Sequence, residues 1–358
     1  MFPTAAETPN QFASAMRLEN LDRTDADANQ VYMNLLFSTT PQAQAAFDTA
    51  SGEIYASLLA QASADGLSRS RRLVARSHEA VAEGWGIWGG VNGADSSVDG
   101  DGNAANADRD EYGFDVGIDY RGSANRWALG VAVGYVDGGL DADNRLSSAE
   151  YDGWHLGAYG RYGTGGSGLT ITGALGYTNT DARVTRSIVV NQLNRTARAS
   201  ADIESIALSG EARYGLAIGN GWNAGPALSI HHASADIGRV SETGANALNL
   251  SGPGTGDDIT RLGGGLFVNW QGANGGIDAS AQYVDGHSNI AQIPFTLQGA
   301  PNATFPVRSP RTDGSAALFT LSGRYALGSG WTISGETRAL VGGEEQSIAG
   351  TLSVGWAF

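Results

Sequence analysis

The residues of this sequence best suited to specific recognition are arginines. Arg69, Arg72 and Arg76 follow one another at spacings of three and four residues, which places them on one face of a helix, and Arg71 lies beside them. A guanidinium group forms two parallel hydrogen bonds with a carboxylate, and the pair is strong where water is partly excluded. We therefore predict that this basic face docks against carboxylates. All 22 basic residues are arginines, which excludes a phosphate-binding or Schiff-base lysine.

Carboxylates suited to this role lie on segments in which apolar and polar residues alternate. Such alternation predicts β-strands whose two sets of side chains point to opposite faces. Five carboxylates and five arginines fall on the polar face: Asp115, Asp119, Glu211, Asp278 and Glu336, with Arg161, Arg213, Arg261, Arg324 and Arg338. An undirected polar lining is the alternative to a docking site for the helix.

Other patterns that could carry chemistry are incomplete. His231 and His232 are adjacent, so a strand sends them to opposite faces, where they cannot share a metal. The stretch from Asp99 to Asp110 resembles a calcium loop, but Ala104 replaces the required glycine and the last ligand is Asp instead of Glu. No lipase, zinc-protease or Walker motif occurs. We therefore expect no metal, no cofactor and no enzymatic activity.

Composition narrows the class of protein. A net charge of -15 argues against nucleic-acid binding, which requires a basic surface, and the absence of cysteine excludes disulfides and thiolate metal sites. No run of about 18 apolar residues occurs, so we expect no transmembrane helix. A mean hydropathy of -0.19 still fits a transmembrane barrel, because half of each strand faces a wet lumen. Neither a basic nor an apolar segment follows Met1, so we expect no signal peptide.

The periodicity of apolar residues divides the chain into helices and strands. Residues 10–62 and 64–83 show apolar spacings of three and four, which predict helices. Twelve strand candidates follow, most of them about nine to eleven residues long, the length that crosses an outer membrane when tilted. They are Trp85–Val91, Tyr112–Tyr120, Trp127–Tyr135, Asp152–Tyr162, Leu169–Tyr177, Ile206–Leu216, Trp222–His232, Leu262–Trp270, Ile277–Tyr283, Phe319–Leu327, Trp331–Val341 and Ile348–Phe358.

The connections between these strands alternate in length. Short turns lie at Arg121–Arg126, Gly163–Gly168, Gly219–Gly221, Gln271–Gly276 and Gly328–Gly330. Long polar segments lie at Asn92–Glu111, Asp137–Glu150, Arg183–Asp202, Ala233–Thr260 and Gly286–Asp313, and Gly342–Gln346 is the exception. Short turns on one side and long loops on the other are typical of outer-membrane barrels.

The last strand decides between a membrane barrel and a soluble β-sandwich, which also alternates. It presents an apolar face that ends in Trp356 and Phe358. An open edge of this kind recruits other chains, whereas a closing strand is paired with the first strand of a barrel. We therefore predict an all-β membrane fold, a 12-stranded antiparallel transmembrane β-barrel with an N-terminal α-helix through its pore and a helical linker before it.

The chain resembles the translocator domain of the autotransporters, the type V secretion systems, over nearly its whole length. The stretch Ala46–Ser57, with Asp48, Ser51, Gly52 and Glu53, is similar to the family's linker motif. The basic segment Arg69–Val74 resembles the part that enters the pore, and Trp356-Ala357-Phe358 resembles the terminal motif, which most outer-membrane barrels share.

The resemblance implies a secretion carrier in the outer membrane of a Gram-negative cell. Residues 1–63 would be a helical linker that follows a missing passenger domain, 64–83 the pore helix and 84–358 the barrel. The implied partners are outer-membrane lipid and lipopolysaccharide, the chain's own passenger, and the barrel-assembly machinery, which would read Trp356 and Phe358; the barrel would be a monomer. The self-cleaving branch of the family cuts between two asparagines in the helix, and this sequence departs from that pattern because no asparagine occurs between Asn34 and Asn92.

Two other functions fit a barrel of this size. A diffusion porin requires an open lumen without a plug. A surface enzyme carried on a barrel requires a nucleophile and a base that converge at the long-loop rim, and the sequence offers no such set.

Overall fold

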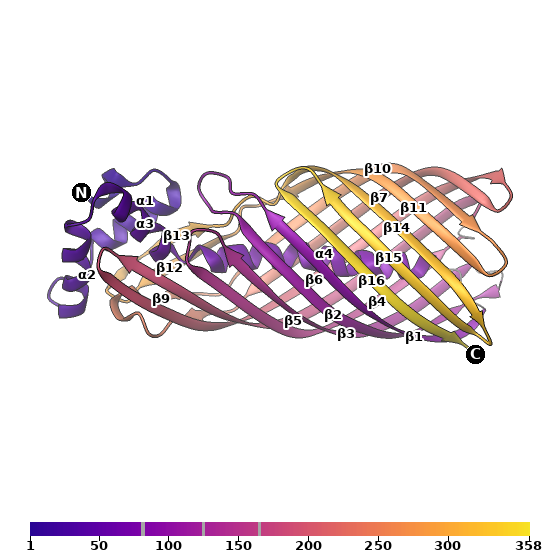
Figure 1. Ribbon diagram of the computed structural model, residues 1–358, viewed down its shortest axis with the longest axis horizontal. Helices are drawn as coiled ribbons and strands as arrows, with labels where there is room; N and C mark the ends of the chain where they lie inside the picture. Colours follow the sequence, from indigo (N-terminus) through magenta and orange to yellow (C-terminus); the bar gives the residue numbers. More distant parts are fainter. Residues whose placement is uncertain (80–82, 124–125, 164–165) are drawn as a thin grey trace.

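The computed structural model describes residues 1–79, 83–123, 126–163 and 166–358. Residues 80–82, at the end of the predicted pore helix, and residues 124–125 and 164–165, in two predicted short turns, lie outside the described residues. The chain opens with helices and continues in strands (Figure 1). The helices are η1 Phe2–Ala5, α1 Pro9–Glu19, α2 Ala26–Leu36, α3 Thr40–Ser51 and α4 Glu53–His78, with a short η3 at Asn246–Leu248.

Twelve strands form a closed antiparallel barrel, as predicted. Its strands are β1 Gly84–Val98, β2 Ala107–Arg121, β3 Trp127–Ala142, β4 Ser147–Tyr162, β5 Gly168–Val190, β6 Leu193–Gly219, β7 Trp222–Ile237, β10 Thr255–Gln271, β11 Gly275–Ser288, β14 Gly314–Gly328, β15 Trp331–Val341 and β16 Glu345–Ala357. The first and last strands pair along their length, with Val91 opposite Leu352, and this closes the barrel. Closure satisfies the backbone groups that an open edge would expose to lipid.

The barrel strands turn large apolar side chains outward and polar or small ones inward. Leu266 and Leu228 are 66% and 65% exposed, whereas Asp119 and Arg161, on the opposite parity, are 1% and 3% exposed. This arrangement is the reverse of a soluble domain and suits a wall with lipid outside and a polar interior. No described helix is both long enough and apolar enough to cross a membrane.

Most of the predicted long loops are themselves strands. The hairpin of β5 and β6 continues without interruption through Arg183–Asp202, so that it extends well beyond its predicted strands. Two other long segments form a separate sheet of β13, β12, β9 and β8, whose bounds are Ala300–Arg308, Gln292–Leu297, Leu250–Gly252 and Val240–Ser241. These segments were predicted as loops because they are polar, but they form strands that pair beyond the membrane-spanning part of the wall.

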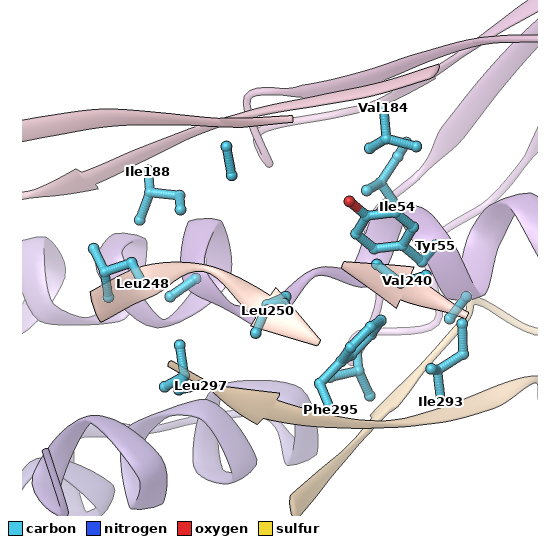
Figure 2. Close-up of a cluster of buried hydrophobic side chains, with 14 of the residues drawn as sticks. Ile54, Tyr55, Val184, Ile188, Val240, Leu248, Leu250, Ile293, Phe295 and Leu297 are labelled. Atoms are coloured by element: carbon cyan, nitrogen blue, oxygen red, sulfur yellow. The ribbon is translucent and has the colours of Figure 1, made fainter. Parts of the chain in front are cut away.

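One apolar core joins this small sheet to the N-terminal helices. The side chains of Ile54, Tyr55, Leu250 and Phe295 pack there, and all four are 0–1% exposed (Figure 2). We call residues 2–51 together with β8, η3, β9, β12 and β13 the cap, because they lie at the barrel end opposite the C-terminus (Figure 1).

Helix α4 runs from the cap into the barrel (Figure 1). It packs against β3, β4, β5, β6, β7 and β10. It is one continuous helix of 26 residues from Glu53, so the predicted boundary at residue 64 lies within it. The bend that separates it from α3 is at Gly52, whose φ of +79° is readily adopted only by glycine.

Candidate functional site

Three arginines of α4 face three carboxylates of a single strand. Arg69 pairs with Glu111, Arg72 Nη2 lies 3.6 Å from Asp115, and Arg76 Nη2 lies 2.9 Å from Asp119. Glu111, Asp115 and Asp119 are spaced by four along β2, so strand alternation turns all of them inward. We call these three residues the β2 carboxylates.

These ion pairs are buried and shared with other groups. The side chains of Arg69, Arg72 and Arg76 are 7%, 11% and 7% exposed. Asp119 also accepts hydrogen bonds from Tyr159, at 3.0 Å, and from Arg121. Because removing one partner of a buried pair leaves the other charge uncompensated, such a network strongly favours the docked position once formed.

Asp65, on α4 itself, adds a further buried pair to this network. Arg109 of β2 lies 2.8 Å from its carboxylate and also pairs with Glu111. Neither Asp65 nor Glu111 was among the predicted site residues. Glu111 was assigned to a long loop, although its spacing of four from Asp115 was visible in the sequence.

The other predicted carboxylates pair mainly within the barrel wall. Glu211 bonds Arg213 at 2.5 Å and also contacts α4 through His78, at 3.0 Å. Asp278 lies 2.9 Å from Arg213. Glu336 lies 2.7 Å from Arg338 of the same strand. Among the five predicted carboxylates, Asp115 and Asp119 therefore meet arginines of the basic face of α4, whereas Glu211, Asp278 and Glu336 pair with arginines of the wall.

Another face of α4 packs against the wall through apolar contacts. Leu67, Leu73 and Val74 are 0–7% exposed and join two clusters with wall residues. The helix comes close to the wall there because the residues that pair across six neighbouring strands are small. They are Gly117, Ala132, Gly157, Gly176, Ala207 and Ala233. A Cβ on Gly157 would come 2.2 Å from a methyl of Leu73, so α4 leaves no space there for a larger residue. The helix is thus held by charge on one face and by close packing on another.

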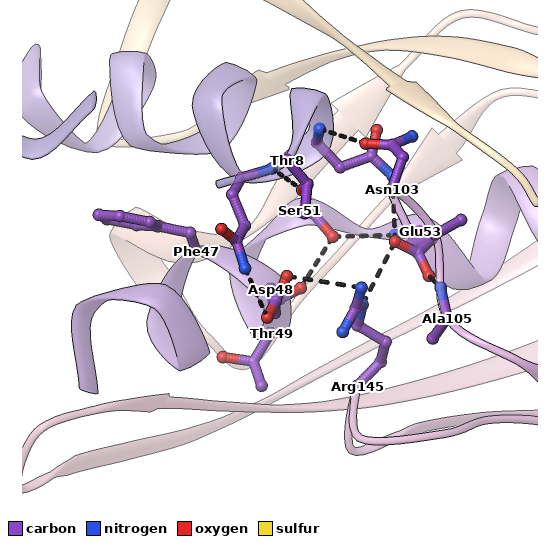
Figure 3. Close-up of polar contacts among 12 residues, drawn as sticks. Thr8, Phe47, Asp48, Thr49, Ser51, Glu53, Asn103, Ala105 and Arg145 are labelled. Atoms are coloured by element: carbon purple, nitrogen blue, oxygen red, sulfur yellow. Dashed lines mark hydrogen bonds and ion pairs between the residues drawn. The ribbon is translucent and has the colours of Figure 1, made fainter. Parts of the chain in front are cut away.

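The linker motif gathers three other segments around one carboxylate at the mouth of the barrel. Glu53 is 2% exposed and accepts hydrogen bonds from Asn10 Nδ2 at 3.0 Å, the Ala105 backbone N–H at 2.7 Å and Arg145 Nε at 3.2 Å (Figure 3). Asp48, near the end of α3, lies 3.5 Å from the same Arg145. Burial raises the pKa of Glu53, while Arg145 acts in the opposite direction. We call these five residues the Glu53 cluster.

A second buried ion pair ties the start of α4 to the cap. Arg186 of β5 holds Glu242 through two hydrogen bonds, at 2.6 and 2.8 Å, and Tyr55 donates to the same carboxylate at 2.8 Å. Arg186 Nη1 also donates to the Thr49 carbonyl, at 2.7 Å. The residues around the linker motif are therefore anchored on several sides, by partners that the local sequence pattern does not indicate.

The sequence of the barrel matches a known protein family. The model of the autotransporter beta-domain matches residues 87–338, which is most of the barrel and well over half of the chain. The chain belongs to the autotransporter beta-domain family. A search of curated proteins found no match.

Solved autotransporter structures share this fold. The translocator domain of NalP from Neisseria meningitidis aligns with a TM-score of 0.66 at 15% identity, covering 84% of this chain and 98% of that one. The beta domain of the Bordetella autotransporter BrkA aligns at 0.53 and 15% identity, covering 77% and 100%. The transport unit of AIDA-I from Escherichia coli aligns at 0.51 and 16% identity, covering 76% and 90%.

Membership of this family answers the question of function at a general level. The autotransporter barrel described here is a secretion carrier of the Gram-negative outer membrane, and its partner is a passenger domain. Neither the porin nor the surface-enzyme alternative has comparable support.

The C-terminus of this autotransporter barrel lies beside its first strand. The Phe358 backbone N–H donates to the Trp85 carbonyl at 2.9 Å, and its ring stacks on Trp356 with centroids 5.0 Å apart. Both rings point outward, at 61% and 37% exposure. Trp331 lies next to Trp356, at 6.3 Å, so the aromatic residues form a group at this end of the barrel.

Proposed function

We propose that α4 is a docked plug that stays in the translocator after the passenger has been delivered. The buried pairs of Arg69, Arg72 and Arg76 with the β2 carboxylates support this role. They are specific in register, because a shift of α4 by one turn would separate each arginine from its partner by about 5 Å. An open porin would have no need of a basic helix inside its lumen.

The proposed functional regions follow the sequence prediction. Residues 1–63 act as the linker, 64–83 as the pore helix and 84–358 as the barrel. The end of the linker and most of the pore helix belong to the same helix, α4. We propose that the cap lies on the cell surface, since its strands β8, β9, β12 and β13 belong to long connections, which face outward in outer-membrane barrels. The passenger would then be presented on the cap side.

The remaining partners follow from the outer face of the barrel. The outward apolar side chains suit contact with outer-membrane lipid and lipopolysaccharide. Trp356 and Phe358, exposed beside the β1–β16 seam, are in a position to be read by the barrel-assembly machinery. A barrel whose strands are all paired needs no second copy, so we propose that the barrel is a monomer. We also propose that it has no enzymatic activity.

Channel conductance tests the plug directly. The intact protein and a variant lacking residues 64–83 are each reconstituted in planar lipid bilayers. We expect the intact protein to conduct much less than the deletion variant. Equal conductance, with both barrels folded, would refute the plug and favour a porin.

The Glu53 cluster can be tested separately. Glu53→Gln replaces one of the two acceptor oxygens by an NH2 group, which cannot accept the bonds that Glu53 makes. Loss of one buried hydrogen bond costs about 1–3 kcal/mol, so the amides of α1 and α3 should exchange hydrogen faster. Glu150→Gln, at an exposed position of β4, is the matched control. Unchanged exchange in both variants would show that the cluster does not hold the linker.

A further inference from the structure

One arginine of α4 has no carboxylate partner. In the described part of the chain no carboxylate lies within ion-pair distance of Arg71, unlike Arg69, Arg72 and Arg76. Its side chain is only 9% exposed, and its Nε and Nη2 atoms donate to no described protein atom. A buried guanidinium with unused donors is expected to have a counter-charge.

The charged side chains that act on Arg71 are mainly positive. The charged side chains that act on it are Arg261 of β10, Arg338 of β15 and Glu345 of β16. Arg261 already pairs with Glu345, and Arg338 with Glu336. The three guanidinium groups thus face two carboxylates that are both engaged, and one positive charge remains uncompensated.

The geometry around this charge is suited to a ligand. Arg338 donates through Nη1 to the Ser68 carbonyl of α4, at 2.7 Å, while its Nη2 has no hydrogen-bond partner among the described residues. Arg261 and Arg338 are 4% and 7% exposed, so the group is largely enclosed. His231 lies opposite Arg261 on the neighbouring strand and brings no negative charge.

We propose that one monovalent inorganic anion of the chloride class binds between Arg71, Arg261 and Arg338. A single negative charge matches the single excess positive charge, and the unused N–H groups of Arg71 and Arg338 supply donors for it. The anion would join α4 to β10 and β15, on a different side of the lumen from the β2 carboxylates. The attachment of α4 to the wall would then depend on the anion concentration of the solution as well as on the protein.

Bromide is the probe that locates the site. Crystals of the full chain are grown in sodium bromide, and diffraction is measured at the bromine absorption edge. We expect an anomalous peak within hydrogen-bond distance of Arg71 Nε or Nη2. It should be lost in Arg71→Gln and kept in Arg324→Gln, a lumen arginine outside this group. The proposal is overturned if the wild-type crystals show no peak at Arg71, or if the peak persists in Arg71→Gln.

Thermal unfolding provides a second measurement, which needs no crystals. Wild type, Arg71→Gln and Arg324→Gln are compared in sodium chloride and in sodium gluconate at equal ionic strength. A ligand that binds only the folded state raises the unfolding midpoint, so chloride should raise it for wild type and Arg324→Gln but not for Arg71→Gln. An equal response of wild type and Arg71→Gln would overturn the site. If Arg71→Gln does not fold, a wild-type midpoint that is the same in both salts still overturns it.

Discussion

Reversing the basic face of α4 should release the helix without unfolding the barrel. In the variant Arg69→Glu, Arg72→Glu and Arg76→Glu, each buried arginine becomes a carboxylate that faces another carboxylate. Leaving one partner of a buried pair uncompensated costs about 3–5 kcal/mol. Glu111 and Asp119 keep Arg109 and Arg121 as second partners, so three such changes fall at the lower end of this range and cost on the order of 10 kcal/mol. The like-charge repulsion adds to this cost.

Ile54, Tyr55, Leu58 and Leu59 pack in the core shared with the cap and hold the first part of α4. In the part that carries the basic face, residues 64–78, apolar packing contributes less than the electrostatic loss. The large apolar side chains there that pack against the wall are Leu67, Leu73 and Val74, and burying each contributes about 1.5–3 kcal/mol. Their sum stays below the electrostatic loss, so we expect the undocked state to be favoured. The barrel should remain closed, because its backbone hydrogen bonds run between strands and β1 pairs with β16 without α4.

Conductance, proteolysis and heat-modifiability together measure this effect. The triple variant should conduct more than wild type and be cut within α4, while its folded and unfolded bands on gels stay as in wild type. The control is Arg198→Glu, Arg239→Glu and Arg311→Glu, which makes the same change of charge at exposed positions. Wild-type conductance and protease resistance in the basic-face variant would refute the reasoning. So would an equal effect of the control.

Three further predictions concern the cap and the C-terminus. Gly52→Ala should make the cap more sensitive to protease, because the left-handed backbone costs about 1–2 kcal/mol and the added Cβ clashes with Leu250. Gly102→Ala, with a similar φ of +82° but open space, should lose only the backbone contribution, and equal effects of the two variants would contradict the clash. The hydrogen bond from Arg195 holds the pKa of Asp27 below its ordinary value of 3.8, so the stability that this bond contributes is present above pH 3.8 and is lost as the pH falls through the lowered pKa. Hydrogen exchange of α2 should therefore rise in acid more in wild type than in Asp27→Asn, and parallel pH profiles of the two proteins would contradict this. Phe358→Asp should reduce the amount of heat-modifiable barrel in the outer membrane, since it places a charge at the lipid interface and alters the terminal residue, and normal levels would count against Phe358 as an assembly signal.

The sequence alone was sufficient to predict the barrel. Strict alternation in segments such as Tyr112–Tyr120 specifies which face of a strand is apolar, and that pattern depends only on neighbouring residues. The alternation of turn lengths and the terminal Phe358 then distinguished a membrane barrel from a soluble sandwich. The position of the basic face on one side of a helix also followed from local spacing.

Tertiary structure decided which groups meet. Sequence parity placed Glu211, Asp278 and Glu336 inside the lumen, but only the lateral position of α4 determines that β2 supplies its carboxylates. Glu111 was missed because its strand begins at Ala107, before the predicted start at Tyr112, in a segment without alternating apolar residues.

The cap shows the same limit more clearly. Glu53 and Arg145 are 92 residues apart in the chain, and nothing in the local pattern of either predicts their contact. The strands of the small sheet were assigned to loops. β12 and β13 form a local hairpin, but the pairing of β9 with β12 joins segments that are distant in sequence. Local spacing determines what each segment of this protein is able to form, while the pairing of buried charges depends on distances that exist only once the barrel has closed around α4.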